Sequence, residues 1–253
     1  MKIPTNKSCG FLIQLYQGRK IEVYTTCRGD GIKGENPYEG FSLCHYTGDS
    51  AEHVAECRDR MSKCIGVPVD RIVIPRQVHG TVCRYVDNNF DDLDIEGVDA
   101  VVTDAAGLVV GVNTADCLPV VMIDECHGIV GVAHAGWRGA LAGVVQSAVR
   151  EMCARGASVG NMEAFMGPCI CAGCFEVGTE VASKFPARNV ALMDKPHVDL
   201  AGYVRDILIG EGIERWMIHL PEECTKCRPE KYFSARASGV ESGRNFTFAV
   251  IRG

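Results

Sequence analysis

Three almost continuous apolar stretches decide the fold of this chain: LVVGVN at residues 108–113, LPVVMI at 118–123 and GIVGVAH at 128–134. Each stretch is short and rich in valine and isoleucine, which favours a β-strand. Apolar residues do not alternate with polar ones here, so we expect these strands to be buried on both faces of their sheet. The centre of the chain therefore predicts a sheet that is covered on both sides.

Further strands and helices are expected on either side of this centre. The expected strands are Phe11–Tyr16, Ile21–Thr26, Arg71–Val78, Val82–Val86, Asp99–Thr103, Met162–Met166, Arg215–His219 and Asn245–Arg252. The other expected elements are a glycine-rich loop at Arg28–Gly40, a helix from Asp49 or Ser50 to about Cys64, and helices at Arg138–Ala154, Val177–Phe185 and Leu200–Gly210. No linker, repeat or low-complexity tract interrupts them, which predicts one α/β domain over residues 1–253.

Composition excludes several classes of protein. The 253 residues are 47% hydrophobic and 23% charged, with a formal net charge of -6, so neither a nucleic acid nor another polyanion is an expected partner. No segment approaches the roughly 18 apolar residues of a membrane span, and Met1–Gly10 lacks the apolar stretch of a secretory signal. We expect a cytoplasmic monomer or small homo-oligomer.

The 14 cysteines are expected to be mainly reduced thiols. A chain of this length without a secretory signal does not need a disulfide framework. Many of the thiols lie in apolar contexts, where a cysteine packs as a small hydrophobic residue: Cys44, Cys57, Cys64 and Cys153.

Three separated residues are candidate metal ligands: His79 in RQVHG, Cys117 in TADCLP and His134 in AHAGWRG. Each lies at the end or beginning of an expected strand, and small or turn-forming neighbours leave room for a ligand to approach. Two imidazoles and one thiolate suit Zn²⁺, and three protein ligands leave a position open for water or substrate. Each residue alone also fits a structural role, as a hydrogen-bonded histidine or a buried cysteine.

Two arginines are candidate anion binders. Arg138 lies near the expected start of a helix, where unsatisfied N–H groups and the helix dipole favour a phosphate. Arg58 lies on the early helix. A surface salt bridge or an exposed first-turn arginine is the competing interpretation for both residues.

A second group of cysteines leaves a further metal site open. Cys169, Cys171 and Cys174 follow Gly167-Pro168, and Cys224 and Cys227 form a C-x-x-C pair. Together they could close a structural tetrahedral zinc site. Buried packing in a Gly-Pro loop and a redox disulfide are the alternatives.

Taken together, these segments resemble the YfiH-like family, also labelled polyphenol oxidase or laccase-domain proteins. The resemblance covers roughly residues 40 to 250, and its most specific parts are Ala-Asp-Cys-Leu-Pro and His-Ala-Gly-Trp-Arg-Gly. It implies a layered α/β/β/α sandwich, zinc ligation by His79, Cys117 and His134, and phosphate or nucleoside binding by Arg58 and Arg138. It also implies phosphorolysis of adenosine, inosine and 5′-methylthioadenosine, together with adenosine deamination.

This sequence departs from the family pattern in two places. Residues 42–46 read Ser-Leu-Cys-His-Tyr where Ser-Leu-Asn-Leu-Gly is common, and residues 234–236 read Ser-Ala-Arg where Ser-Tyr-Arg is frequent. Both departures concern the expected substrate pocket rather than the metal ligands.

Four chemistries compete for the expected site. Zinc lowers the pKa of a bound water to about 7, which suits deamination, and could orient phosphate for phosphorolysis. A copper polyphenol oxidase is second: copper binds such ligands when it is supplied, but a multicopper enzyme needs many histidines in His-x-His pairs, and this chain has 7 histidines and no such pair. The others are a metal-free Cys–His hydrolase with Cys117 as nucleophile, and a non-enzymatic protein. The sequence does not identify a proton donor to the departing base.

Overall fold

The structure, a computed structural model, describes residues 9–32, 36–91 and 95–253; parts of the expected segments Met1–Gly10 and Arg28–Gly40 lie outside these ranges. Its strands are β1 (Leu12–Gln17), β2 (Ile21–Thr26), β3 (Ile72–Val73), β4 (Cys83–Tyr85), β5 (Ala100–Thr103), β6 (Val109–Thr114), β7 (Leu118–Asp124), β8 (Ile129–Ala135), β9 (Glu163–Met166), β10 (Val190–Leu192), β11 (Pro196–Val198), β12 (Ile218–His219) and β13 (Asn245–Ile251). Its α-helices are α1 (Ala51–Ile65), α2 (Trp137–Ala142), α3 (Val144–Ala154), α4 (Thr179–Ala182), α5 (Leu200–Gly210) and α6 (Ala235–Ser238).

The large strands form two mixed sheets. The first has the order β1-β2-β13-β6-β3, with all neighbours antiparallel except β3 and β6. The second has the order β12-β9-β7-β8-β5-β4, and only its outer pairs, β12 with β9 and β4 with β5, are parallel. Strands β10 and β11 form a separate hairpin.

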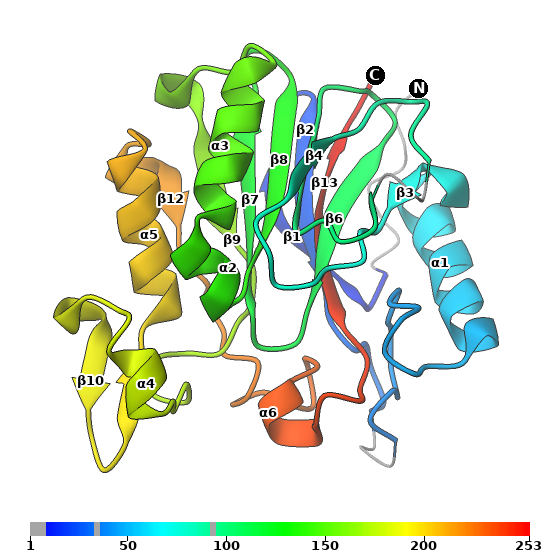
Figure 1. Ribbon diagram of the computed structural model, residues 1–253. Helices are drawn as coiled ribbons and strands as arrows, with labels where there is room; N and C mark the ends of the chain where they lie inside the picture. Colours follow the sequence, from blue (N-terminus) through cyan, green and yellow to red (C-terminus); the bar gives the residue numbers. More distant parts are fainter. Residues whose placement is uncertain (1–8, 33–35, 92–94) are drawn as a thin grey trace.

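Helices cover the outer faces of the two sheets, and the sheets pack against each other, as Figure 1 shows. One apolar cluster lies between the sheets and includes Val112, Val121 and Val132. A second joins the six-stranded sheet to α3 and α5, and a third joins the five-stranded sheet to α1. This arrangement confirms the expected α/β/β/α sandwich. It also explains the apolar central stretches, because β6, β7 and β8 are buried along their whole lengths.

Several expected elements are shorter or divided in the structure. The expected helix Arg138–Ala154 is two helices, because Gly143 takes a left-handed conformation (φ 101°) between α2 and α3. The expected strand Arg71–Val78 keeps only two residues, since Pro75 cannot donate to a ladder. Only the middle of the expected helix at 177–185 is helical, and the first part of the expected strand at 215–219 is a 3₁₀ turn.

The expectation of reduced, packed thiols is wrong for two cysteines. Cys64 forms a disulfide with Cys9, which ties the beginning of the described chain to the last turn of α1. Cys153 is exposed rather than packed, whereas Cys44 and Cys57 are buried free thiols as expected. Within the described ranges, no helix combines the length and the apolarity that crossing a bilayer would require.

Candidate metal centre

His134 is held rigidly inside the six-stranded sheet. It lies on β8, opposite Pro119 of β7, and only 3% of its surface is exposed. Its Nδ1 lies 2.9 Å from Oδ1 of Asp99, a fully buried carboxylate. This contact fixes the tautomer that carries the proton on Nδ1, so that Nε2 is left to bind a metal.

The same carboxylate also shapes the loop that carries His79. Asp99 Oδ1 accepts the backbone N–H of His79 at 2.9 Å, and Oδ2 accepts those of Gly80 at 2.7 Å and Val78 at 3.2 Å. These bonds hold His79 in a left-handed conformation (φ 62°), which is uncommon for a residue with a side chain. The expectation that His79 ends a strand is therefore wrong: a buried carboxylate positions it on a loop.

Cys117 follows a second strained residue. Asp116 has a φ of 87° and is nearly buried. Its Oδ1 accepts the hydroxyl of Thr225 at 2.7 Å, and its Oδ2 accepts the backbone N–H of Arg236 at 2.7 Å. The turn before β7 is thus fixed from the C-terminal part of the chain, and it turns Cys117 toward the two histidines.

The three side chains converge. One ligand atom from each of His79, Cys117 and His134 lies within 4.8 Å of the others, and Cys117 Sγ is 3.8 Å from His79 Nε2. Tetrahedral bonds to zinc from nitrogen and sulfur would place two such atoms about 3.5 Å apart, so the set fits Zn²⁺ with little adjustment. A Cβ on Gly136 would lie 2.9 Å from His79 and 3.0 Å from the Cys117 sulfur, so glycine keeps this space clear.

The charges of Cys117, His134 and Asp99 depend strongly on one another. Burial raises the pKa of the Cys117 thiol, but the charge of His134 and hydrogen bonds from both histidines outweigh burial and lower this pKa to about 6. Burial lowers the pKa of His134, but Cys117 and Asp99 outweigh it and raise this pKa to about 9. Burial likewise raises the pKa of Asp99, yet hydrogen bonds from His134 and from Gly80 hold it below its ordinary value.

The metal-free protein should therefore alkylate at Cys117 at unusually low pH. After removal of metal with a chelator, the rate of iodoacetamide labelling is expected to rise with pH and then level off, with a midpoint at about pH 6, because the thiolate is the nucleophile. Mass spectrometry of the Cys117 peptide measures this rate. A midpoint near 9.0, the ordinary value for a thiol, would contradict the thiolate–imidazolium pair.

The three residues line a cavity of about 720 Å³, within the range of small-molecule sites. Its walls come from loops, from the ends of strands β6 and β8, and from helices α2, α4, α5 and α6. The lining residues are Tyr46, Gln77, His79, Asn113, Thr114, Ala115, Asp116, Cys117, His134, Trp137, Arg138, Ile170, Phe175, Val177, Gly178, Glu180, Val181, Leu200, Ala235, Arg236, Val240 and Arg244. Tyr46 and Ala235 belong to the two segments that depart from the family pattern, so both departures reach the cavity wall.

One wall of the cavity includes Asn113 and Thr114, which Gln77 helps to position. Gln77 makes two 2.8 Å hydrogen bonds to the backbone of Asn113, which joins the His79 loop to β6. Asn113 Oδ1 and Thr114 Oγ1 are buried and have no hydrogen-bond partner among the described residues. Both atoms are out of contact with solvent, so neither is presented to the cavity, although both residues contribute to its wall.

Arginines line the same cavity. The Arg138 guanidinium stacks over Trp137, 4.3 Å from the ring centroid, and the side chain is exposed. Arg236 donates from Nη1 to the carbonyl of Glu176 at 2.9 Å. Because α2 has only six residues, the positive charge at the cavity comes from the guanidinium groups of the arginines and not from a long helix.

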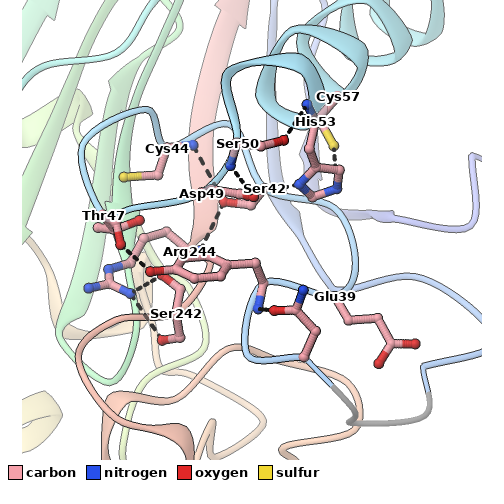
Figure 2. Close-up of polar contacts among 12 residues, drawn as sticks. Glu39, Ser42, Cys44, Thr47, Asp49, Ser50, His53, Cys57, Ser242 and Arg244 are labelled. Carbon is pink, nitrogen blue, oxygen red and sulfur yellow. Dashed lines mark hydrogen bonds and ion pairs between the residues drawn. The ribbon is translucent and has the colours of Figure 1, made fainter.

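Arg244 is anchored by its own loop, as Figure 2 shows. Its Nη1 donates to the carbonyl of Ser242 at 2.7 Å, and its Nη2 donates to that of Val240 at 2.8 Å. Ser42 Oγ accepts the backbone N–H groups of Cys44 and Arg244, at 3.4 Å and 3.0 Å. The segment that carries Tyr46 is thereby fastened to the loop that carries Arg244.

The structure separates Arg58 from this group. Arg58 lines a smaller hollow with His45, Arg76 and Glu96, and it is not among the residues that line the large cavity. Its Nη2 lies 3.4 Å from His45 Nδ1. A role for Arg58 in substrate binding stays a prediction.

Sequence reasoning missed the residues that position the ligands. Asp99 accepts hydrogen bonds from the backbone of the His79 segment, whereas Asp116 and Gln77 belong to ligand segments and fasten them to Arg236 and to Asn113. A carboxylate directly before a buried strand, as in Asp99-Ala100, is the one signal that could have drawn attention to Asp99.

Comparisons with known proteins agree with this architecture. Residues 22–252 match the family model described as multi-copper polyphenol oxidoreductase laccase. A relative from an unknown prokaryotic organism, named adenosine deaminase RL5, is 42% identical over 243 residues, which cover 90% of this chain and 92% of the relative. A purine nucleoside phosphorylase of Bacteroides thetaiotaomicron is 30% identical over 248 residues, which cover 91% of this chain and 92% of that protein.

Solved structures share the fold. The crystal structure of hypothetical protein YfiH from Bacillus licheniformis has a TM-score of 0.88 at 23% identity, covering 97% of this chain and 98% of that one. YlmD from Geobacillus stearothermophilus has a TM-score of 0.83 at 25% identity, covering 93% of each chain. Together with the sequence matches, these structures confirm the predicted resemblance and the predicted α/β architecture.

Proposed function

We propose that this chain, which belongs to the multi-copper polyphenol oxidoreductase laccase family, is a zinc-dependent enzyme of purine nucleosides. Its reactions are phosphorolysis of adenosine, inosine and 5′-methylthioadenosine, and deamination of adenosine. The names of two relatives, an adenosine deaminase and a purine nucleoside phosphorylase, support this substrate class. The observation that carries the proposal is the convergence of His79, Cys117 and His134 at a cavity of nucleoside size.

Zinc is the metal that suits these ligands. Held by the two imidazoles and the thiolate, it would supply Lewis acidity to a substrate in the cavity. The protein's own part is to hold the ligands: Asp99 fixes the tautomer of His134 and the backbone of His79, and Asp116 fixes the turn before Cys117. Such outer contacts tune the affinity of a site for its metal.

In phosphorolysis, an oxygen of phosphate forms a bond to C1′ of the ribose while the bond from C1′ to the purine nitrogen breaks. The base leaves and takes up the proton of the hydrogen phosphate, so the products are the free base and ribose 1-phosphate, or methylthioribose 1-phosphate from 5′-methylthioadenosine. We assign the phosphate to Arg138 and Arg236, which both line the cavity, since guanidinium groups bind phosphate oxygens in pairs. We assign the nucleoside to the wall that includes Asn113 and Thr114.

Replacing Arg138 by alanine should raise the KM for phosphate more than the KM for nucleoside. Loss of one charge-assisted hydrogen bond costs about 1.5–3 kcal/mol, which corresponds to a rise of roughly tenfold to a hundredfold. Steady-state kinetics with inosine and varied phosphate measures it, and Arg150→Ala, an exposed arginine outside the cavity, is the control. An unchanged KM for phosphate would remove Arg138 from the phosphate site.

The whole proposal is tested on protein purified without added metal. Elemental analysis is expected to find zinc, and inosine with phosphate is expected to yield hypoxanthine and ribose 1-phosphate. Adenosine without phosphate is expected to yield inosine and ammonia. Metal-replete protein that neither cleaves nor deaminates any of the three nucleosides would overturn the proposal.

A copper oxidase fits this site less well, although the family description names copper. Two histidines and one cysteine are also the equatorial ligands of a blue copper site, which adds a weak axial ligand, commonly methionine. None of the residues that line the cavity is a methionine. Among the described residues, the other candidate metal cluster consists of cysteines alone, so a histidine-rich copper cluster is absent from that part of the chain.

One observation favours a second candidate, a metal-free Cys–His hydrolase. Cys117, His134 and Asp99 form the nucleophile, base and orienting carboxylate of such an enzyme, and the low pKa of Cys117 suits a nucleophile. Zinc would occupy the same sulfur and block that role. Ester hydrolysis that increases when a chelator removes the metal would favour the hydrolase, whereas loss of nucleoside turnover on chelation would favour the zinc enzyme.

A further inference from the structure

A second group of cysteines lies apart from the cavity that His79, Cys117 and His134 line (the active cavity). Two of the segments that sequence analysis singled out, 171–174 and 224–227, come together although they are about fifty residues apart. Cys169 is not a member: it is buried, and its sulfur lies 3.5 Å from the carbonyl of Ile170. Four free thiols remain, one pair from each segment: Cys171 and Cys174, Cys224 and Cys227.

The spacing of the four sulfurs is that of a metal tetrahedron. All lie within 4.8 Å of one another, and those of Cys174 and Cys227 are 3.4 Å apart. Four zinc–sulfur bonds of about 2.3 Å would place the sulfurs about 3.8 Å apart in a tetrahedron. The alternative is two disulfides. Disulfides would require the sulfurs to be close only within each pair, whereas all four sulfurs lie close together.

The backbone around the thiols is built like a zinc knuckle. Each pair is a C-x-x-C turn, the common ligand spacing of structural zinc sites. The first turn is closed by the N–H groups of Cys174 and Phe175, which both donate to the carbonyl of Cys171. The N–H of Cys171 donates to the sulfur of Cys224 at 3.2 Å, a contact that supports a charged thiolate bound to metal.

We propose that Cys171, Cys174, Cys224 and Cys227 bind a structural Zn²⁺, separate from the metal of the active cavity. Four protein ligands close the coordination sphere and leave no position for substrate, so this zinc cross-links the chain instead of taking part in the reaction.

The cross-link supports the active cavity from outside. It joins the loop after β9 to the loop after β12, which a parallel bridge between Cys169 and Cys224 also connects. The second loop carries Thr225, whose buried hydroxyl donates to Asp116, the residue before Cys117. The first carries Ile170 and Phe175, which line the cavity. Removal of this zinc therefore loosens the support of one active-site ligand without removing any ligand itself.

Metal analysis of variants tests the site. Wild-type protein purified without added metal is expected to hold one more zinc per chain than the double variant Cys174→Ser/Cys227→Ser. The double variant Cys126→Ser/Cys153→Ser, which changes two exposed thiols outside the cluster, is expected to retain the wild-type content. Cys117→Ala is expected to retain the zinc of the four cysteines, so this site is measured whether or not the nucleoside activity is found.

Alkylation of the wild-type protein gives a second test that does not depend on a variant that folds. With zinc bound, the four clustered thiols are expected to resist iodoacetamide, whereas Cys126 and Cys153 react. After treatment with a chelator all four should label. Equal zinc content in the wild type and Cys174→Ser/Cys227→Ser would overturn the proposal, as would disulfide-linked peptides among the four cysteines in freshly purified protein.

Discussion

Replacing Cys117 or His79 by alanine is expected to remove metal from the active cavity and to abolish nucleoside turnover, while the fold stays intact. Each side chain supplies one of three ligands, and neither packs in the sheet core as His134 does. A metal acting as a Lewis acid contributes several kcal/mol of transition-state stabilisation, and about 4 kcal/mol corresponds to roughly a thousandfold in rate. Zinc content and the rate of hypoxanthine release from inosine with phosphate measure both effects.

The matched control is Cys126→Ala, an exposed thiol outside both cysteine-containing clusters, which should leave zinc content and turnover unchanged. Circular dichroism checks that the sheets and helices persist. A Cys117→Ala or His79→Ala protein that holds no metal in the cavity yet still cleaves inosine with phosphate would show that the proposed chemistry is wrong.

Replacing Asp99 by alanine is expected to have the largest effect on stability. The variant would leave His134 without its buried partner and the N–H groups of Val78, His79 and Gly80 without an acceptor. Removal of one partner of a buried ionic pair costs about 3–5 kcal/mol. Urea unfolding of the metal-free protein measures this loss in the free energy of unfolding.

The more conservative variant Asp99→Asn tests whether the negative charge at residue 99 is needed in addition to an acceptor oxygen at that position. The amide keeps one oxygen but cannot accept all these bonds, so metal affinity is expected to fall by about 10–100-fold. Asp104→Ala is the control, because that carboxylate is exposed and accepts only the Tyr85 hydroxyl, at 2.7 Å, among the bonds described. If Asp99→Ala unfolds at the same urea concentration as Asp104→Ala, the central role of Asp99 is refuted.

The distribution of apolar residues along the chain predicted most of the helices and strands. The bounds of β2 and α5 were predicted to the residue, and the central strands to within one residue at each end. The central strands are fully buried and α5 spans 11 residues, so their patterns depend little on distant residues. The shape of the sandwich came from family resemblance rather than from the pattern itself.

Elements that depend on single backbone positions were predicted less well. A helical pattern runs through Gly143, but the sequence does not tell whether this glycine takes a helical or a left-handed conformation. Pro75 has no N–H to donate to a ladder. The apolar residues around it nevertheless led to the prediction of a longer strand. The short hairpin of β10 and β11 was missed, because three residues per strand give too little alternation to detect.

The candidate ligands could be proposed from the sequence, but their support could not. Chemistry restricts which side chains bind zinc, and small or turn-forming neighbours at expected strand ends single out His79, Cys117 and His134 among the histidines and cysteines. Their positions depend on hydrogen bonds across 20 to 120 residues, from Asp99 to the His79 loop and from Asp116 to Arg236. The local sequence pattern does not indicate contacts between residues that are so far apart in the chain.

The wide separation of the ligands along the chain also couples ion uptake to conformational stability. No short peptide of this protein contains two of the three cavity ligands, so this centre exists only in the folded chain. Each tenfold rise in free zinc above its dissociation constant then adds at most about 1.4 kcal/mol to the native state, because cysteines of the unfolded chain also bind zinc. A melting curve recorded at several free zinc concentrations would thus double as a titration of the centre.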